Sequence, residues 1–415
     1  MKRKFLYLLF LAPSLVGCSS QETSVLTSKA PNSNSSLPEV TVPRVFGKIV
    51  HLSSSLVETH FFNVDTDEFK ISNDIRGSGG ALLVDGEYLE VGTADGRFIG
   101  IDLKTEEIEN AILPALNMGS DSMPQSKTIT YQETLPRLHD LVLFAGIHYA
   151  TFDRYVPSED RVRFVVARIR RGEKEWEDLY VSPPLPTALF TLGSGGAIAV
   201  DNFGESLYFS VGDFSLDRLN GLPSDYAPQS ENLPWGHILK MNLTTFRTVL
   251  FSKGHRNPVG LTFLDNGKLL SSEMGPRGGD ELNFISQGMN YGWPFASYGT
   301  YYGNFNRYSV PQDWKTGFVS VEPVYIFLPS VAPSSLFQSQ TFDESWSGNI
   351  VMGSLKGESI FNIKINGENV FYSEQIPLGK RIRDLAESGN VIFCLTDAGT
   401  VIRIVKSKNI EDLPD

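Results

Sequence analysis

The chain of 415 residues carries 36 Lys and Arg against 48 Asp and Glu, a net charge of −12 at pH 7. Such an acidic chain repels polyphosphate, which argues against nucleic acid as a partner. Because 41% of the residues are hydrophobic and 11% are aromatic, the body of the chain can bury a large core and is not disordered. The length does not require two domains, since β-propellers of this size occur as one unit.

The amino terminus has the composition of a signal peptide. Residues 2–4 are all basic, residues 5–16 form a short apolar run, and the run ends in LVGC at residues 15–18. A basic region followed by a short apolar region is typical of secretory signals. The apolar run is too short for a membrane-spanning helix.

The stretch around Cys18 resembles the signal of bacterial lipoproteins. The resemblance implies that residues 1–17 are removed and that Cys18 becomes the lipidated first residue. Because Ser19 rather than Asp follows, it also implies lipid anchoring at the periplasmic face of the outer membrane. Residues 18–44 are polar and typical of a flexible tether. We expect the folded domain over residues 45–415.

Beyond residue 44, short runs rich in Val, Ile, Phe and Tyr alternate with dipeptides that favour tight turns. Four such dipeptides can adopt the positive φ of a two-residue hairpin: Asp85-Gly86, Asp95-Gly96, Asn266-Gly267 and Asn366-Gly367. No long amphipathic helix is evident. The pattern therefore predicts an all-β fold.

One pattern recurs along the chain: an inner strand, a tight turn, a second strand, and then small or acidic residues. It occupies residues 79–103, 195–213, 259–275 and 382–404, and two further stretches, 136–185 and 345–377, fit it more loosely. A repeated sheet unit that cannot bury its own faces indicates a propeller. We expect six blades, with the segment after residue 44 closing the ring. A β-sandwich, the competing fold, explains the hairpins but not the repeat.

The stretch GHRNPVGLTF at residues 254–263 places polar groups before an apolar strand. Arg256 and Asn257 precede a proline there, so both side chains are expected at the mouth of the strand. An Arg fork suits carboxylate or quinone oxygens, and Asn adds a short directional donor. A turn with a surface Arg is the alternative reading.

The stretch EMGPRGGDELN at residues 273–283 combines glycines and a proline with carboxylates. Gly275 and Pro276 can present backbone carbonyls, and Asp280 and Glu281 supply carboxylates, all of them hard oxygen ligands that suit Ca²⁺. A backbone poor in side chains also lets a metal or a flat cofactor approach closely. The alternative is an acidic turn capped by Asn283.

Cys394 lies in a strand-like run, VIFCLTD. Once Cys18 is lipidated, Cys394 has no cysteine left for an intramolecular disulfide. We expect a buried structural thiol here rather than a nucleophile.

Five motifs together resemble the soluble glucose/sorbosone dehydrogenase family, the PQQ-dependent aldose sugar dehydrogenases with a six-bladed propeller. The motifs are RNPVGL at 256–261, SSEMGPRGGDELN at 271–283, GMNYGWP at 288–294, GSLKG at 353–357 and RIRD at 381–384. The resemblance covers the chain from about residue 77 onward and is weak before residue 190.

The resemblance implies a tri-acidic quinone, PQQ, held over a Ca²⁺ ion. By similarity the residues that contact PQQ are Arg256, Asn257, Lys356, Arg381 and Arg383. The backbone oxygens of Gly275 and Pro276 are implied as ligands of the cofactor's Ca²⁺, and Glu281 and Tyr291 match a second, structural calcium site of some members. Fixed cations suit a cofactor with three carboxylates, and in a chain of net −12 they must be gathered locally.

The general base of the family is missing from its expected position. Members carry it as the histidine of His-x-x-Gly-Arg-Leu, where it takes a proton from the sugar while hydride passes to the quinone. Here Gly193 stands at the histidine position and Ala197 at the arginine position, and Met274 replaces the histidine of the family's EHGP.

The chain has 6 histidines: His51, His60, His139, His148, His237 and His255. His255, directly before Arg256, is the one candidate for a displaced base; His139 and His148 belong to another blade. A packed, hydrogen-bonded histidine is the alternative for each of them.

Three functions stay open at this point. The first is a lipid-anchored PQQ-dependent dehydrogenase that acts on a sugar or another alcohol and passes electrons to an acceptor the sequence does not identify. The second is a non-catalytic PQQ- or sugar-binding propeller that has lost its base. The third is a hydrolase propeller of the lactonase kind, which would need acidic ligands from several blades, whereas this chain gathers basic residues in its later ones.

Overall fold

The computed structural model describes residues 48–51, 63–70, 79–119, 136–186, 193–216, 226–302, 305–312 and 315–406. The chain divides into two units, Met1–Arg44 and Val45–Asp415. The predicted signal peptide, Cys18 and the tether fall in the first unit, outside the described residues. Within the described ranges, no helix is long and apolar enough to cross a membrane.

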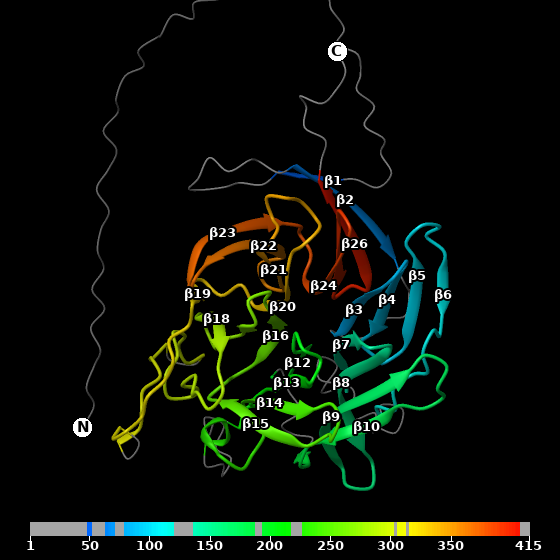
Figure 1. Ribbon diagram of the computed structural model, residues 1–415. Helices are drawn as coiled ribbons and strands as arrows, with labels where there is room; N and C mark the ends of the chain where they lie inside the picture. Colours follow the sequence, from blue (N-terminus) through cyan, green and yellow to red (C-terminus); the bar gives the residue numbers. More distant parts are fainter. Residues whose placement is uncertain are drawn as a thin grey trace, which may run out of the picture. The chain divides into compact units, whose positions relative to one another are not determined.

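The second unit is built from six antiparallel sheets arranged around a common centre (Figure 1). The first three sheets in chain order have the following strands. Sheet one contains β3 (Gly80–Asp85), β4 (Tyr88–Thr93), β5 (Phe98–Asp102) and β6 (Ile108–Asn110). Sheet two contains β7 (Leu138–Phe144), β8 (Ile147–Val156), β9 (Arg161–Arg170), β10 (Glu177–Val181) and the short β11 (Leu185–Pro186). Sheet three contains β12 (Gly195–Val200), β13 (Ser206–Val211), β14 (His237–Asn242) and β15 (Thr248–Lys253), with a 3-10 turn, η3 (Ala227–Gln229), between β13 and β14.

The remaining three sheets follow in the same order around the centre. Sheet four contains β16 (Pro258–Phe263), β17 (Leu269–Glu273), β18 (Asp280–Ile285) and β19 (Tyr325–Phe327). Sheet five contains β20 (Pro333–Gln338), β21 (Ile350–Ser354), β22 (Ser359–Asn366) and β23 (Asn369–Pro377). Sheet six contains β24 (Ile382–Ser388), β25 (Val391–Thr396) and β26 (Thr400–Lys406), joined by β2 (Asn63–Lys70) and β1 (Lys48–His51).

The six sheets close into a ring. The first strand of each, β3, β7, β12, β16, β20 and β24, packs against the first strand of the next sheet, and β24 packs against β3. Strand β2 pairs with β26, so a strand from the start of the domain completes the last sheet. The prediction of a six-bladed propeller, closed by the segment after residue 44, is confirmed, and the β-sandwich is excluded.

The hydrophobic core lies between adjacent blades. Strand β13 is buried at all six positions, which explains why its sequence does not alternate between polar and apolar residues. Phe164 of β9 and Phe209 of β13 stack across the boundary between blades two and three, with ring centroids 6.2 Å apart. Burial on both faces is what a repeated sheet unit gains from its neighbours.

Hydroxyl groups connect neighbouring blades near the centre. Ser210 Oγ on β13 donates to the carbonyl of Pro258 on β16 at 2.8 Å, and Ser272 Oγ on β17 donates to the carbonyl of Ser334 on β20 at 2.6 Å. Each bond runs from the second strand of one blade to the first strand of the next. These buried bonds fix the amino-terminal ends of the inner strands, where the candidate site lies.

Two local predictions are also confirmed. The four predicted hairpin dipeptides lie at turns, and their glycines have φ of 62°, 82°, 78° and 65° at residues 86, 96, 267 and 367. Only a residue without a side chain adopts these angles at no cost. Cys394 is buried in β25 with its thiol free, and burial raises the pKa of that thiol.

Candidate functional site

A cavity of about 1090 Å³ opens at the amino-terminal ends of the inner strands. Every blade contributes lining residues. Side chains enter through a recurring feature: the inner strands of several blades are irregular near their start, as between Leu138 and Asp140 and between Ile382 and Asp384. A bulge re-aims the residue that it contains, and the intervening His139 and Arg383 both line the cavity.

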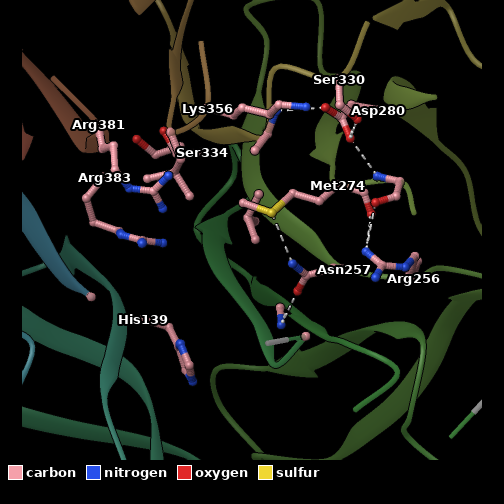
Figure 2. A pocket seen from close by; sticks show the side chains of 18 of the residues that line it. His139, Arg256, Asn257, Met274, Asp280, Ser330, Ser334, Lys356, Arg381 and Arg383 are labelled. Atoms are coloured by element: carbon pink, nitrogen blue, oxygen red, sulfur yellow. Dashed lines mark hydrogen bonds between the residues drawn. The ribbon is translucent and has the colours of Figure 1, made fainter. Parts of the chain in front are cut away.

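The cations predicted from the sequence meet in this one cavity. Its lining includes Arg256 from blade four, Lys356 from blade five, and Arg381 and Arg383 from blade six. Figure 2 shows the two blade-six arginines on one side of the pocket and Arg256 on the other. If these four side chains had pointed to separate outer surfaces, they could not bind one anion together. Because all four line one cavity, they form a candidate anion-binding site.

Asp397 holds two of these arginines in place. Its Oδ2 accepts from Arg381 Nε at 2.8 Å, and its Oδ1 accepts from Arg383 Nε at 2.9 Å and Nη2 at 2.8 Å. The side chains of Arg383 and Asp397 are each 15% exposed, against 48% for Arg381. One carboxylate therefore orients two guanidinium groups and offsets only one of their charges.

Arg256 is fixed by backbone carbonyls. Its Nη1 donates to Met274 O at 3.0 Å and to Gly275 O at 2.9 Å, and its own backbone N–H donates to the Glu273 carboxylate. The guanidinium also lies 5.6 Å from the centroid of the Trp293 ring. Gly275 is needed here because a side chain would approach within 2.2 Å of the carbonyl oxygen of Gly279.

Asn257 lines the cavity, but both ends of its amide are engaged. Oδ1 accepts from Gly195 N–H at 2.9 Å, and Nδ2 lies 3.4 Å from the sulfur of Met274. The side chain thus connects blade four to blade three. Met274, which stands where the resembling family has a histidine, gives this amide only a weak acceptor.

Three aspartates in the lining serve the backbone. Asp140 accepts from Leu141 and Ile198 N–H, and Asp384 from Leu385 and Leu82 N–H, so each binds its own strand and the inner strand of the next blade. Asp280 accepts from Gly275, Val331 and Ala332 N–H and from Ser330 Oγ. Burial raises the pKa of all three carboxyls, that of Asp384 to about 6.

Gly193, at the family's histidine position, lies in the cavity wall. A Cβ at this position would lie 3.2 Å from Asp213 Oδ1, a tight contact. Ala197, at the family's arginine position, is buried in β12 and is not part of the lining. The structure thus has no basic side chain at either position.

His139 lines the cavity, although the sequence analysis did not predict it as a site residue because it belongs to another blade. It does belong to blade two, yet it lines the same cavity as the cations. Its Nε2 lies 2.9 Å from Oδ2 of Asp153, with the two side chains 5% and 0% exposed. Asp153 Oδ2 also accepts from Ser194 Oγ at 3.1 Å, directly beside Gly193.

His255 does not line the cavity. It is fully buried, with Nε2 2.8 Å from Ser252 Oγ and Nδ1 3.0 Å from Glu273 Oε2. Its ring also stacks on Tyr291 at 4.7 Å. Because both ring nitrogens have partners, the side chain acts as a packed, hydrogen-bonded residue and cannot reach a ligand in the cavity.

Glu281 and Tyr291 lie beside the main cavity, around smaller pockets behind Gly275 and Pro276. Glu281 is directly opposite Glu273 across β17 and β18. Burial, and then the charge of Glu273, raise the pKa of Glu281 to about 8. The hydroxyl of Tyr291 is engaged with Phe284 O at 2.6 Å and Ser286 N at 2.9 Å, so that oxygen is a poor candidate for a ligand.

Arg137 and His139 were missed although the sequence contains a signal for them. RLHD at 137–140 repeats RIRD at 381–384, and the two stretches occupy equivalent places on β7 and β24. Asp153 N–H donates to Arg137 O and Asp397 N–H to Arg381 O, each at 3.0 Å. Burial, then the charge of Arg383, lower the pKa of Arg137 to about 10, so this additional lining cation stays charged at pH 7.

Comparison with known proteins extends these observations. A family model described as glucose/sorbosone dehydrogenase matches residues 145–403. Quinoprotein glucose dehydrogenase B of Acinetobacter calcoaceticus is 30% identical over 276 residues, covering 48% of this chain and 58% of that protein. An aldose sugar dehydrogenase of Escherichia coli is 28% identical over 225 residues, covering 51% of this chain and 59% of that protein. The chain thus spans less than two thirds of the length of these relatives.

Solved structures share the fold. The soluble aldose sugar dehydrogenase of Escherichia coli in its apo form aligns with a TM-score of 0.65 at 19% identity, over 82% of this chain and 100% of that one. The PQQ-bound aldose sugar dehydrogenase of Streptomyces coelicolor aligns with a TM-score of 0.57 at 20% identity, over 82% and 98%. At such identities the likeness concerns the propeller alone.

Proposed function

Because the chain belongs to the glucose/sorbosone dehydrogenase family, we propose that it is a PQQ-dependent dehydrogenase that oxidises an aldose sugar or a related alcohol. One observation carries the proposal: Arg256, Lys356, Arg381 and Arg383, from three blades, line one cavity. Fixed cations in a concave site bind an anionic ligand in a defined orientation. PQQ, with three carboxylates, is such a ligand.

The residues present fit PQQ. The cavity of about 1090 Å³ slightly exceeds the usual size range of small-molecule sites and leaves room for a second molecule. Arg381 and Arg383 would hold carboxylates or quinone oxygens with the N–H groups that Asp397 does not use. Arg256 and Lys356 would hold the opposite side. When bound, the quinone supplies the acceptor for a hydride from the substrate.

Calcium is the second part of the proposal. Gly275 and Pro276 line the cavity, and a backbone carbonyl has two lone pairs, so Gly275 O can accept from Arg256 and still bind a cation. Glu281, which is half-buried, lies opposite the buried Glu273 on the neighbouring strand. A divalent cation there would relieve the repulsion between the two carboxylates, which supports a structural calcium site near Glu281 and Tyr291.

The proposed location is the periplasmic face of the outer membrane, with the propeller held by a lipid on Cys18. The support is the lipoprotein-like signal and the polar stretch of residues 18–44. Electrons would leave the site to a separate acceptor.

A second candidate is favoured by Gly193: a propeller of the same family that binds PQQ or a sugar without turnover. The absence of a histidine at that position removes the family's usual base, and general base catalysis contributes about 10² to 10⁴ in rate.

Reconstitution separates the two candidates. The purified protein is stripped of metal, supplied with PQQ and Ca²⁺, and followed by absorbance for binding and by dye reduction with a panel of aldoses and alcohols for turnover. Saturable binding with sugar-dependent dye reduction is the expected result. Binding without dye reduction would favour the second candidate, and no saturable binding of PQQ would overturn the dehydrogenase proposal.

A further inference from the structure

We propose that His139, oriented by Asp153, is the general base of this dehydrogenase, in place of the histidine missing at position 193. The inference rests on the proposed function and adds a catalytic residue to it. His139 is the one histidine among the described residues that lines the cavity with the cations. It enters from β7, whereas Gly193 lies two residues before the start of β12.

The internal repeat supports the orientation of His139. On β24 the residue at the irregular position is Arg383, and its side chain is paired with Asp397, which directly follows β25. On β7 the same position is occupied by His139, and its partner is Asp153. Blade two therefore repeats the cation-and-carboxylate pair of blade six with an imidazole in place of a guanidinium. Arg383 and His139 are both directed to the cavity (Figure 2).

The surroundings of the imidazole make it a proton acceptor. The Asp153 carboxylate lies 2.9 Å from Nε2 without hydrogen-bond alignment. Its negative charge still favours the tautomer with the proton on Nε2, which leaves the lone pair on Nδ1. No described residue is hydrogen-bonded to Nδ1. Asp153 is fully buried, held by Ser194 Oγ and near the cation Arg137. A carboxylate in this position stabilises the imidazolium that forms when Nδ1 takes a proton.

Space for the imidazole comes from the neighbouring blade. A Cβ on Gly196 would lie 2.3 Å from Cβ and 2.5 Å from Cγ of His139. Only glycine at this position of β12 lets the ring fit between the inner strands of blades two and three. The pocket for the imidazole is thus built by both strands.

Other acids and bases in the lining are engaged elsewhere. The carboxyls of Asp140, Asp280 and Asp384 accept hydrogen bonds on both oxygens, from backbone N–H groups of two or more segments. A carboxyl that fixes two blades cannot turn toward a substrate without breaking those bonds. His139 is the lining base with a ring nitrogen left over.

The proposed step balances as a two-electron oxidation. The O–H bond of the sugar's anomeric hydroxyl would break and its proton would pass to Nδ1 of His139, and bound PQQ would supply the acceptor for the hydride on the same carbon. The aldose becomes a lactone, and His139 later returns its proton to solvent. This chain's part in the step is the proton transfer.

The test compares His139→Gln and His139→Arg with His148→Gln. His148 is a matched control because it is also a buried blade-two histidine paired with a carboxylate, Glu90 at 2.8 Å, but lies outside the lining. Both His139 variants should lose about 10² to 10⁴ in kcat while the Kd for PQQ changes less than about threefold. His148→Gln should keep both. If His139 were instead a cationic contact to PQQ, as Arg383 is proposed to be, His139→Arg would retain turnover and His139→Gln would weaken PQQ binding, which would overturn the base assignment.

Two further measurements separate chemistry from folding. In His139→Gly, added imidazole should restore dye reduction in a saturable manner, whereas a purely structural histidine would not be replaced by free imidazole. In the PQQ-free protein, nitrogen NMR of the His139 ring should show the proton on Nε2, and Asp153→Asn should disturb it; a proton on Nδ1 would overturn the assignment. Wild-type protein that binds PQQ without turnover would refute the base and leave the binding function, and wild-type protein that binds no PQQ would refute the dehydrogenase proposal itself.

Discussion

Replacement of Arg383 by methionine is the sharpest test of the anion site. Arg383 is 15% exposed and lines the cavity, and Asp397 occupies its Nε and Nη2, which leaves Nη1 available to a ligand. A hydrogen bond to a charged group contributes about 1.5–3 kcal/mol, so its loss should raise the Kd for PQQ by about 10- to 150-fold. Methionine preserves much of the side-chain volume, which keeps the packing of the inner strand intact.

The assay is an absorbance or calorimetric titration of the metal-loaded protein with PQQ. A matched control is Arg163→Met on β9: the Nε and Nη2 of Arg163 also share one carboxylate oxygen, that of Glu159, and its side chain is 24% exposed. Arg163 lies outside the cavity lining, so its replacement should leave the Kd unchanged. Equal PQQ affinity in Arg383→Met and wild type, or an equal loss in both variants, would refute the reasoning that this cavity is an anion site.

Three further predictions follow from individual groups. The pKa of Glu281 is raised from 4.5 to about 8 by burial and by Glu273, so the folded state holds a proton that the unfolded state releases. Stability of the calcium-free protein should therefore fall as pH rises from about 4.5 to 8, and Glu281→Gln should flatten that slope in thermal melts; an unchanged slope would contradict the shift. Cys394, buried and with a raised pKa, should resist maleimide in folded Cys18→Ser protein and react only after unfolding. Cys18→Ser should move the protein from the membrane fraction to the soluble periplasm, and continued membrane retention would count against the lipid anchor.

The fold was predictable because the same strand–turn–strand pattern recurs along the sequence, once for each of the six blades. Each blade repeats an inner strand, a tight turn and a second strand, and the glycines at 86, 96, 267 and 367 have the positive φ that the turns need. Ring closure was harder to predict. It depends on pairing between β2 and β26, which are separated by nearly the whole domain, and pairing at such a distance leaves no local pattern.

Site residues that belong to contiguous sequence motifs were predicted, whereas a site residue whose position depends on the three-dimensional packing of the strands was missed. Arg256, Lys356, Arg381 and Arg383 were found through contiguous motifs, and all line the cavity. His139 was missed because its place depends on a strand irregularity and on the space above Gly196, neither of which composition reveals. His255 was favoured by its neighbour Arg256 in sequence. Both residues lie in the connection between β15 and β16, where Arg256 lines the cavity and His255 is fully buried.

The charge balance of the cavity argues for an anionic cofactor rather than for a sugar alone. A chain of net −12 gathers six cations in one lining, counting Arg137 and Arg277 with the four that were predicted. The cations outnumber the three aspartates of the lining, Asp140, Asp280 and Asp384, and Asp397 compensates only one of the two arginines that it holds. Binding a neutral sugar would not offset the free-energy cost of desolvating several fixed cations, whereas a ligand with three carboxylates offsets it through ion pairs. The cation set is therefore best understood as the half of the site that binds the cofactor, and His139 as the part that faces the substrate.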